Sequence, residues 1–302
     1  MDNFIVRWYN QNRRIIWTAI LTIVGIIALI QTLNNNHKNN PKVVSSTSDS
    51  TTNYNTNSYS IITRYDIEEE TAEESVKLIE QFFEYCNNGK IEQAYNLLSI
   101  DCKETLYPTM EDFKSKYYNK IFTERKNYNS NLWITDLEKH TYRLEIMADL
   151  LATGKKDNMP IEDYYTIVEE EGQNKLNISR YVGKENINIT KAQDNITVNI
   201  VSKKIYIDYE IYEIEVYNNS LNKLIFNTKE NTDSIYIQDE NELKYIAFLN
   251  EIPNSELEIS SGSKKELEIK FNRGYKPHID IVRITFKDIK SKIEIEKFEI
   301  DI

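Results

Sequence analysis

Residues 71–99 read TAEESVKLIEQFFEYCNNGKIEQAYNLLS, and this stretch decides how the first part of the chain is expected to fold. Thr71 and Glu74 have the spacing of a capping box, which predicts a helix N-terminus. Apolar side chains then recur at helical spacing and share one face: Val76, Ile79, Phe83 and Cys86. Gly89 is a natural stop for this helix. The segment 91–99 predicts a second, short helix.

After these helices the sequence changes its period. Thr109 can cap a third helix, whose apolar face comprises Phe113, Tyr117 and Ile121. Beyond residue 130 apolar and polar residues alternate, which predicts four strands: 131–138, 141–152, 162–171 and 174–183. The run Glu171-Gly172-Gln173-Asn174 is typical of a hairpin turn between the last two strands. Three helices followed by an antiparallel sheet predict an α+β domain over residues 67–185.

The order of these elements, together with the helix–glycine–helix phrase NNGKIEQAY at 87–95, resembles the nuclear-transport-factor-two-like superfamily. Scytalone dehydratase and ketosteroid isomerase share this cone-shaped fold. The resemblance covers residues 70–185 and includes no catalytic motif. It implies a curved sheet that closes over a central cavity. Members outside the cytoplasm, tethered by one N-terminal helix, are common in assemblies of the cell envelope.

The enzymes of that superfamily use a carboxylate, a histidine or a tyrosine inside the cone. The resemblance therefore makes six residues of the predicted sheet candidates for an inward-facing site: Asp136, His140, Tyr142, Glu145, Tyr164 and Tyr165. A shift of one residue in register would reverse the face of each. The alternative is a filled cone, plugged by large side chains such as Trp133, Met147 and Tyr165. We favour the filled cone and assign no catalytic, cofactor-binding or metal-binding residue.

Residues 186–302 predict a β-sandwich that is similar to immunoglobulin-like modules. Nine segments alternate or are apolar over strand length: 196–202, 205–218, 223–229, 234–239, 244–250, 256–260, 265–271, 280–289 and 292–300. The hallmark cysteines and tryptophan of antibody domains are absent from this region of the sequence. Within 205–218 the alternation changes parity near Ile211 and Tyr212, which predicts a bulge or a break into two strands.

The N-terminal region predicts a membrane anchor. Residues 15–33 carry no charge, and 19 residues at about 1.5 Å each span roughly the thickness of a bilayer's hydrocarbon core. Arginines in the tail 1–14 favour a cytoplasmic N-terminus, with everything after the span outside. One alternative is a buried core helix, but core helices are rarely apolar on every face for this length. The other is a cleaved signal peptide, but the apolar run is long and no small-residue cleavage site follows. Residues 34–66 are rich in Asn, Ser and Thr, which predicts a flexible linker.

Composition excludes several kinds of chemistry. A net charge of −11 disfavours nucleic acid as a partner. Cys86 and Cys102 could pair or remain two buried thiols, and the sequence has no C-x-x-C motif. The three histidines, His37, His140 and His278, fit no nucleophile motif. The acidic run QDENE at 238–242 lacks the spacing of a calcium loop. No glycine-rich phosphate loop occurs, so we expect no cofactor.

These patterns favour a single-pass, membrane-anchored binding or scaffold protein of the cell envelope that is not an enzyme. Its expected partners are the membrane, through Ile15 to Leu33, and a protein of the envelope. One alternative is a tethered assembly component of a conjugation or secretion machine, which the superfamily resemblance implies. A pocket isomerase or dehydratase is the other alternative, and it would need an open cone lined by a buried carboxylate.

Overall fold

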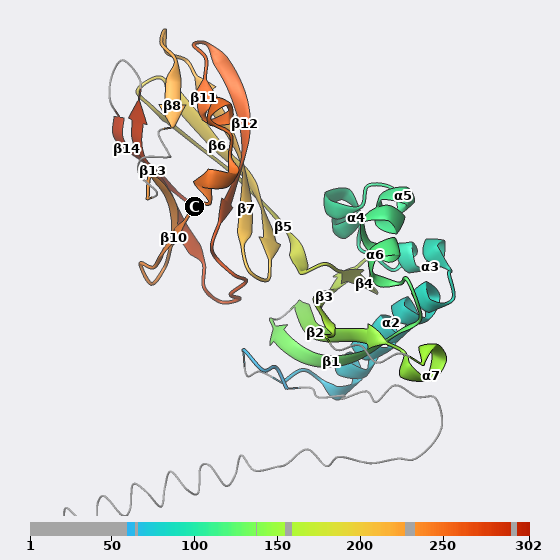
Figure 1. The fold of residues 1–302 in the computed structure, drawn as a ribbon. Coiled ribbons are helices and arrows are strands. Elements are labelled where there is room, and N and C mark those ends of the chain that lie inside the picture. The colour runs from blue at the N-terminus through green and yellow to red at the C-terminus, as the bar shows by residue number, and fades with distance from the viewer. Residues whose placement is uncertain (1–58, 64–65, 137, 155–158, 227–232, 291–294) are drawn as a thin grey trace, which may run out of the picture. The chain divides into compact units, whose positions relative to one another are not determined.

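The computed structural model describes residues 59–63, 66–136, 138–154, 159–226, 233–290 and 295–302. The predicted tail 1–14, the predicted span 15–33 and most of the predicted linker lie outside these residues. No helix in the described ranges is long and apolar enough to cross a membrane. The chain from Thr52 to Ile302 forms one compact unit, in which helices come first and antiparallel sheets follow (Figure 1).

The last part of the predicted linker is bonded to a sheet. The N–H groups of Ile61 and Ile62 donate to the carbonyl oxygens of Leu132 and Trp133 at 3.1 and 2.9 Å. The Ser60 hydroxyl donates to the Trp133 carbonyl at 2.8 Å. The described chain therefore begins along the outer edge of the first strand of that sheet.

The first predicted helix is present as α2 (Glu69–Asn87), and its predicted apolar face is buried. Its start differs from the expectation, because Thr71 lies inside the helix and makes no capping box. Glu69 and Glu70 in the first turn favour the earlier start, since negative charge stabilises a helix N-terminus. The predicted stop is confirmed: Gly89 has φ +70° and its N–H donates to the Cys86 carbonyl at 3.1 Å.

Shorter helices follow, and two of them differ from the prediction. The second predicted helix, α3 (Ile91–Asn96), ends early because Leu98 pairs with Leu176 of the sheet. An unpredicted helix, α4 (Ile100–Leu106), begins where the Ser99 side chain accepts the Cys102 N–H at 2.8 Å. The third predicted helix is confirmed as a helical run of three pieces: α5 (Met110–Phe113), a π-helical turn (Lys114–Tyr118) and α6 (Asn119–Ile121).

The first sheet has four antiparallel strands in the order β1-β2-β3-β4. The strands are β1 (Lys126–Thr135), β2 (Lys139–Ala148), β3 (Ile161–Glu170) and β4 (Gln173–Asn177). Glu171 and Gly172, both with positive φ, form the predicted hairpin turn. The strand predicted over 141–152 ends at Ala148, because the Asp149 side chain caps the short helix α7 (Leu150–Thr153).

The second sheet has the order β12-β7-β6-β5. Its strands are β5 (Tyr181–Gln193), β6 (Ile196–Tyr206), β7 (Glu210–Asn218) and β12 (Ser263–Phe271). The strand predicted over 174–183 is broken between Asn177 and Tyr181 and covers only the first three residues of β5. The rest of β5 was not predicted, and the domain boundary expected at residue 186 falls inside it. The predicted change of parity is a break into two strands, and it lies at residues 207–209, slightly before the predicted position.

A third sheet faces the second in a sandwich-like arrangement. Its order is β10-β9-β13-β8-β11, and β14 pairs with β13. The strands are β8 (Leu224–Phe226), β9 (Ile235–Asp239), β10 (Lys244–Ile246), β11 (Glu258–Ile259), β13 (Ile281–Lys290) and β14 (Ile295–Asp301). Two 3₁₀ turns, Leu249–Glu251 and Asn254–Leu257, connect β10 to β11.

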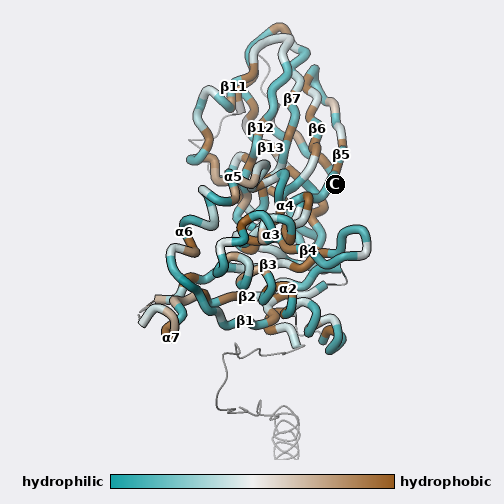
Figure 2. The backbone as a smooth tube through the Cα atoms, turned by 90° about the vertical axis from the view of Figure 1, so that its right-hand side faces the viewer, coloured by the Kyte–Doolittle hydropathy of each residue, from teal (hydrophilic) through white to brown (hydrophobic). Residues whose placement is uncertain are grey.

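Two hydrophobic cores stabilise these layers. The core between the second and third sheets is lined by β-branched and aromatic side chains such as Ile200, Ile214, Ile237, Phe271 and Phe286. The other core lies between the helices and the first sheet, and it also receives Tyr206 at the end of β6. Figure 2 shows that apolar and polar residues alternate along the strands. This alternation directs apolar side chains to one face of a sheet and polar side chains to the other.

Gly274 marks a close approach between two backbone segments. A Cβ built at this position would lie 2.6 Å from the Ile207 carbonyl oxygen, while the Tyr275 N–H donates to that same oxygen at 3.0 Å. We expect Gly274→Ala to destabilise the full-length protein by about 1–3 kcal/mol, since backbone must move to relieve the clash. Urea denaturation in mild detergent measures the change.

The matched control is Asn272→Ala, two residues earlier. The Asn272 side chain is exposed, so its truncation should change the free energy of unfolding by less than about 0.5 kcal/mol. Equal stability of the two variants would contradict the close approach as a constraint on the fold.

Candidate functional site

The first sheet divides the six candidate residues between its two faces and its turns. Tyr142 and Tyr165 point into the core beneath the helices. Glu145 alternates with them along β2 and ion-pairs with Arg143 on the other face. Tyr164 lies on that same outer face, where the Arg180 guanidinium stacks 4.7 Å from its ring centre. The inward-facing set is therefore smaller than the sequence predicted.

Two of the three side chains expected to fill the cone lie elsewhere. Trp133 packs against Tyr164 on the outer face, with ring centres 6.0 Å apart. Met147 is half-buried and lies outside the interior cluster. Both follow from strand alternation, because Leu132 and Ile146 next to them point inward. Of the predicted plugs, only Tyr165 is inside.

Packed aromatic rings occupy the space between the helices and the sheet. The Phe82 ring lies 5.6 Å from the Tyr165 ring and 6.2 Å from the Phe113 ring, in edge-to-face arrangements. Phe83 is 4.2 Å from Tyr128 and 5.4 Å from Phe122, also between ring centres. This geometry is favourable for aromatic pairs. Side chains therefore fill the space between the helices and the first sheet.

One carboxylate, Asp163, lies within this core, and sequence reasoning missed it. Asp163 Oδ1 accepts the Tyr164 N–H at 2.8 Å, and the Tyr117 hydroxyl donates to Oδ2 at 3.5 Å. Burial raises the pKa of Asp163 to about 6, although the N–H groups of Ser179 and Arg180 oppose this shift. Since Asp163 shares strand parity with Tyr165, the inward position of Tyr165 was the signal that could have identified it.

Tyr117 and Tyr165 complete this buried polar cluster. Their hydroxyl groups hydrogen-bond to each other, and burial raises the pKa of both phenols well above the usual value. Both tyrosines are therefore neutral at physiological pH. A buried carboxylate among neutral hydroxyls could act as a general base only with space for a substrate, and aromatic rings take that space.

Asp136 and His140 stabilise local structure. Asp136 Oδ1 accepts the N–H groups of Glu138 and Lys139 at 2.8 and 2.7 Å, which closes the β1–β2 turn. The Asp136 carboxylate also accepts the Tyr275 hydroxyl. His140 Nδ1 lies 2.7 Å from the Thr135 hydroxyl, and burial lowers the pKa of the imidazole. These bonds position backbone and neighbouring side chains.

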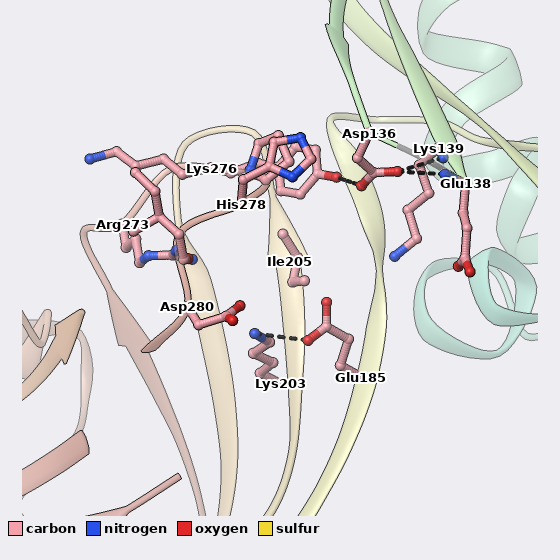
Figure 3. A pocket seen from close by; sticks show the side chains of 13 residues that line it. Asp136, Glu138, Lys139, Glu185, Lys203, Ile205, Arg273, Lys276, His278 and Asp280 are labelled. Atoms are coloured by element: carbon pink, nitrogen blue, oxygen red, sulfur yellow. Dashed lines mark hydrogen bonds and ion pairs between the residues drawn. The ribbon is translucent and has the colours of Figure 1, made fainter. Parts of the chain in front are cut away.

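A charged recess of about 310 Å³ lies beside that turn (Figure 3). Three separate segments form its walls: the β1–β2 turn, strands β5 and β6, and the loop 273–280. Inside it Lys203 pairs with Glu185 at 2.8 Å. His278 lines the recess with φ +68°, a conformation uncommon outside glycine. Both cations and anions line the recess, so it suits a polar, charged partner.

A buried ion pair supports the loop of the recess. Arg273 is 3% exposed, and its Nη1 donates to the fully buried Glu210 carboxylate. Its Nη2 donates to the Ile279 carbonyl oxygen, which holds the loop in place. The Tyr212 hydroxyl also donates to Glu210, at 3.1 Å. Burial raises the pKa of Glu210, and the positive charge of Arg273 opposes that shift.

The remaining groups singled out in the sequence have structural surroundings. Cys86 and Cys102 are free, buried thiols, and burial raises the pKa of Cys102 to about 12. In the QDENE run, Asp239 Oδ1 accepts the N–H groups of Asn241 and Leu243, which closes a turn. Within the described ranges, no group of three or more His, Cys, Asp or Glu residues could hold a metal ion.

No protein-family model matches the chain, and no curated protein matches it.

Asp163 predicts a dependence of stability on pH. Its native-state pKa of about 6 exceeds the ordinary value of 3.8, so the native state binds the proton more tightly than the unfolded state. Its contribution to the free energy of unfolding should therefore fall as pH rises from about 4 to 7, by about 3 kcal/mol. Asp163→Asn removes this decline, and urea denaturation across that pH range measures it.

The control is Asp194→Asn, in the exposed β5–β6 turn. It removes a carboxylate without altering the buried cluster, so it should keep the wild-type pH profile. If Asp163→Asn also kept that profile, the buried carboxylate would not be the source of the pH dependence.

Removing one partner of the Arg273–Glu210 ion pair should lower the stability of the protein strongly. Arg273→Met leaves a buried carboxylate without its cation, which should cost about 3–5 kcal/mol of stability. The double variant Arg273→Met with Glu210→Met should recover most of this loss, because neither charge remains buried. Equilibrium denaturation of the full-length protein in detergent measures both.

Arg283→Met serves as the comparison on the surface. Arg283 pairs with Asp301 at 2.7 Å, but both side chains are exposed, so its loss should cost about 0–1 kcal/mol. A double variant no more stable than Arg273→Met would show that the buried pair is not coupled.

Proposed function

We propose that this chain is a non-catalytic binding or scaffold protein of the cell envelope, anchored by one span at residues 15–33. The bulk of the chain then lies on the extracytoplasmic face. The observation that carries the proposal is the aromatic packing around Phe82 and Tyr165, which fills the interior of the first part. A pocket isomerase or dehydratase needs that space for its substrate. Binding of a partner through the outer surfaces needs no interior space.

We further propose that the first part is a nuclear-transport-factor-two-like domain and the second an immunoglobulin-like one. The helices that precede the sheet β1-β2-β3-β4 support the first assignment. The two facing antiparallel sheets with one core support the second. Domains of both kinds serve many functions, so the assignment of function rests on the interior and the surfaces, not on the fold.

The charged recess supports a role in binding. Its walls come from residues far apart in sequence, including Asp136, Lys203 and Lys276. The side-chain bonds Asp136–Tyr275 and Lys203–Glu185 hold these walls before any partner arrives. A pre-formed polar recess loses little conformational entropy when it binds. A charged segment of another envelope protein is the partner that this chemistry favours.

The topology of the proposal can be tested with one introduced thiol. Both native cysteines are buried and should react slowly with maleimides. Leu221→Cys places a thiol at a side chain that is 94% exposed, in the loop after β7. In intact cells, a membrane-impermeant maleimide should label this variant as fully as it does after permeabilisation. Labelling only after permeabilisation would contradict an extracytoplasmic location.

Binding is tested in the same cells with a photo-crosslinking amino acid at Lys276, on the recess, and at Glu92 as a control on α3. The Lys276 position should yield a discrete crosslinked envelope protein that the Glu92 position does not. Absence of any crosslinked protein at Lys276 would count against the binding role of the recess.

A further inference from the structure

Exposed apolar side chains gather along one edge of the first sheet, where β1 is the outermost strand. Six of the large hydrophobic residues that are exposed in the described chain lie on this edge or next to its ends: Tyr59, Ile61, Ile62, Leu150, Leu151 and Met159. We call these residues the β1-edge patch. The other exposed apolar residues lie at scattered positions in the sequence. A concentration of this kind marks an interaction surface.

The members of this patch lie near the two ends of β1. Ile61 and Ile62 bond to Leu132 and Trp133, toward one end of the strand. Helix α7 lies at the other end, where the Asp149 N–H donates to the Arg125 carbonyl oxygen at 2.9 Å. Figures 1 and 2 both show α7 on the side of the sheet that β1 borders. The patch therefore consists of two apolar groups at opposite ends of β1, with the exposed Asn127 and Asn129 side chains between them.

Helix α7 holds its leucines outward by specific bonds. Asp149 Oδ1 accepts the N–H groups of Leu151 and Ala152 at 3.1 and 3.3 Å, and Gly154 ends the turn in the left-handed conformation. Arg125 Nε pairs with the Asp149 carboxylate at 3.1 Å. As a result Leu150 is 55% exposed and Leu151 is 92% exposed. Met159 is 85% exposed beside them in sequence.

The shape of these residues favours lipid over a protein groove. Side chains as exposed as Leu151 and Met159 protrude, and protruding apolar side chains insert between lipid headgroups. The half-exposed Arg125 side chain is paired with Asp149, so its positive charge is already compensated. The proposed contact with lipid therefore rests on the apolar side chains of the patch.

The rest of the chain also directs this edge to a bilayer. The described residues begin at Tyr59, within the patch. The uncharged stretch 15–33 precedes them, separated by residues 34–58. Twenty-five residues can bridge at most about 80–90 Å when fully extended. The described chain thus begins at the same edge of the first sheet, at the end of β1 away from α7.

We propose that the β1-edge patch docks on the phospholipid bilayer, with Leu150, Leu151 and Met159 inserted among the headgroups. This inference rests on the proposed function, since the anchor at residues 15–33 brings the edge to the membrane. Docking adds a second attachment beside the anchor. The folded part then keeps one face toward the lipid, and its other surfaces stay directed away from the membrane.

The test uses the full-length protein reconstituted in vesicles of phosphatidylcholine and phosphatidylglycerol. Leu151→Cys is labelled with an environment-sensitive NBD fluorophore, and Leu221→Cys carries the same label as a control of equal exposure. The two native thiols are buried and stay unlabelled. We expect the emission of the Leu151 label to shift to the blue and to lose intensity with lipids that carry a quencher near the headgroup. The Leu221 label should do neither.

A second variant separates insertion from an accidental effect of the label. Leu150→Ser with Met159→Ser, combined with the labelled Leu151→Cys, removes apolar side chains that contribute little to the core. It should lose both the blue shift and the quenching. Retention of both in this variant would overturn insertion of the patch as a unit.

The remaining outcomes distinguish the inference from its premise. If the protein floats with the vesicles but the Leu151 label behaves as it does in water, docking is wrong and the anchor stands. If the protein does not float, the anchor fails and the inference with it. A blue shift that rises with the protein-to-lipid ratio, without quenching by lipid, would show a second copy of the chain on the patch and would also overturn docking on lipid.

Discussion

The turn at Ser179 and Arg180 is the constraint on which the arrangement of the chain depends. Both residues have left-handed backbone, with φ 60° and 63°. This conformation costs roughly 1–2 kcal/mol for each non-glycine residue, so surrounding groups must stabilise it. The Tyr107 hydroxyl hydrogen-bonds to the Ser179 hydroxyl at 2.6 Å, and the buried Asp163 carboxylate faces the N–H groups of the turn. The polar cluster in the first core thereby determines the direction in which β5 leaves β4.

The same turn also bonds to the second part of the chain. The Ile207 N–H donates to the Arg180 carbonyl oxygen at 2.9 Å, and Arg180 Nε pairs with Asp208 at 2.8 Å. Ile207 in turn accepts the Tyr275 N–H next to Gly274. The break between β6 and β7, the loop 273–280 and the β4–β5 turn are therefore linked through main-chain hydrogen bonds. That linkage gives the charged recess its fixed walls.

Much of this fold could be predicted from the sequence, and the failures have physical causes. Helical periodicity identified α2, and two residues of positive φ produced the predicted turn at Glu171 and Gly172. Helix α4 was missed because a seven-residue helix has too few turns to show a periodic face. Most of strand β5 was missed because its side chains are mostly exposed and polar, with a bulge between Asn186 and Ile189.

The candidate site was harder to predict than the fold. The face of a strand residue depends on register, and a bulge such as the one between Leu132 and Ile134 shifts the register of the residues that follow it. The charged recess could not be found at all, because Asp136, Lys203 and His278 meet only through tertiary structure. Asp163 could have been found, since its parity follows from that of Tyr165. The sequence pattern identified candidate residue types, but tertiary packing determines which of those residues lie close together.

The exposed face of the sheet β12-β7-β6-β5 and the β1-edge patch differ in their charged side chains. On the sheet β12-β7-β6-β5, Lys204 bonds to both Glu213 and Glu268 at 2.7 Å, and hydrogen bonds from Lys204, Ser202 and Lys184 lower the pKa of Glu213 to about 2 despite its partial burial. These ion pairs compensate the charges on this face of the sheet, which suits contact with water. The β1-edge patch has exposed apolar side chains where this sheet has ion pairs. On a chain with a net charge of −11, the leucines exposed at this edge are the feature on which the proposed docking to lipid rests.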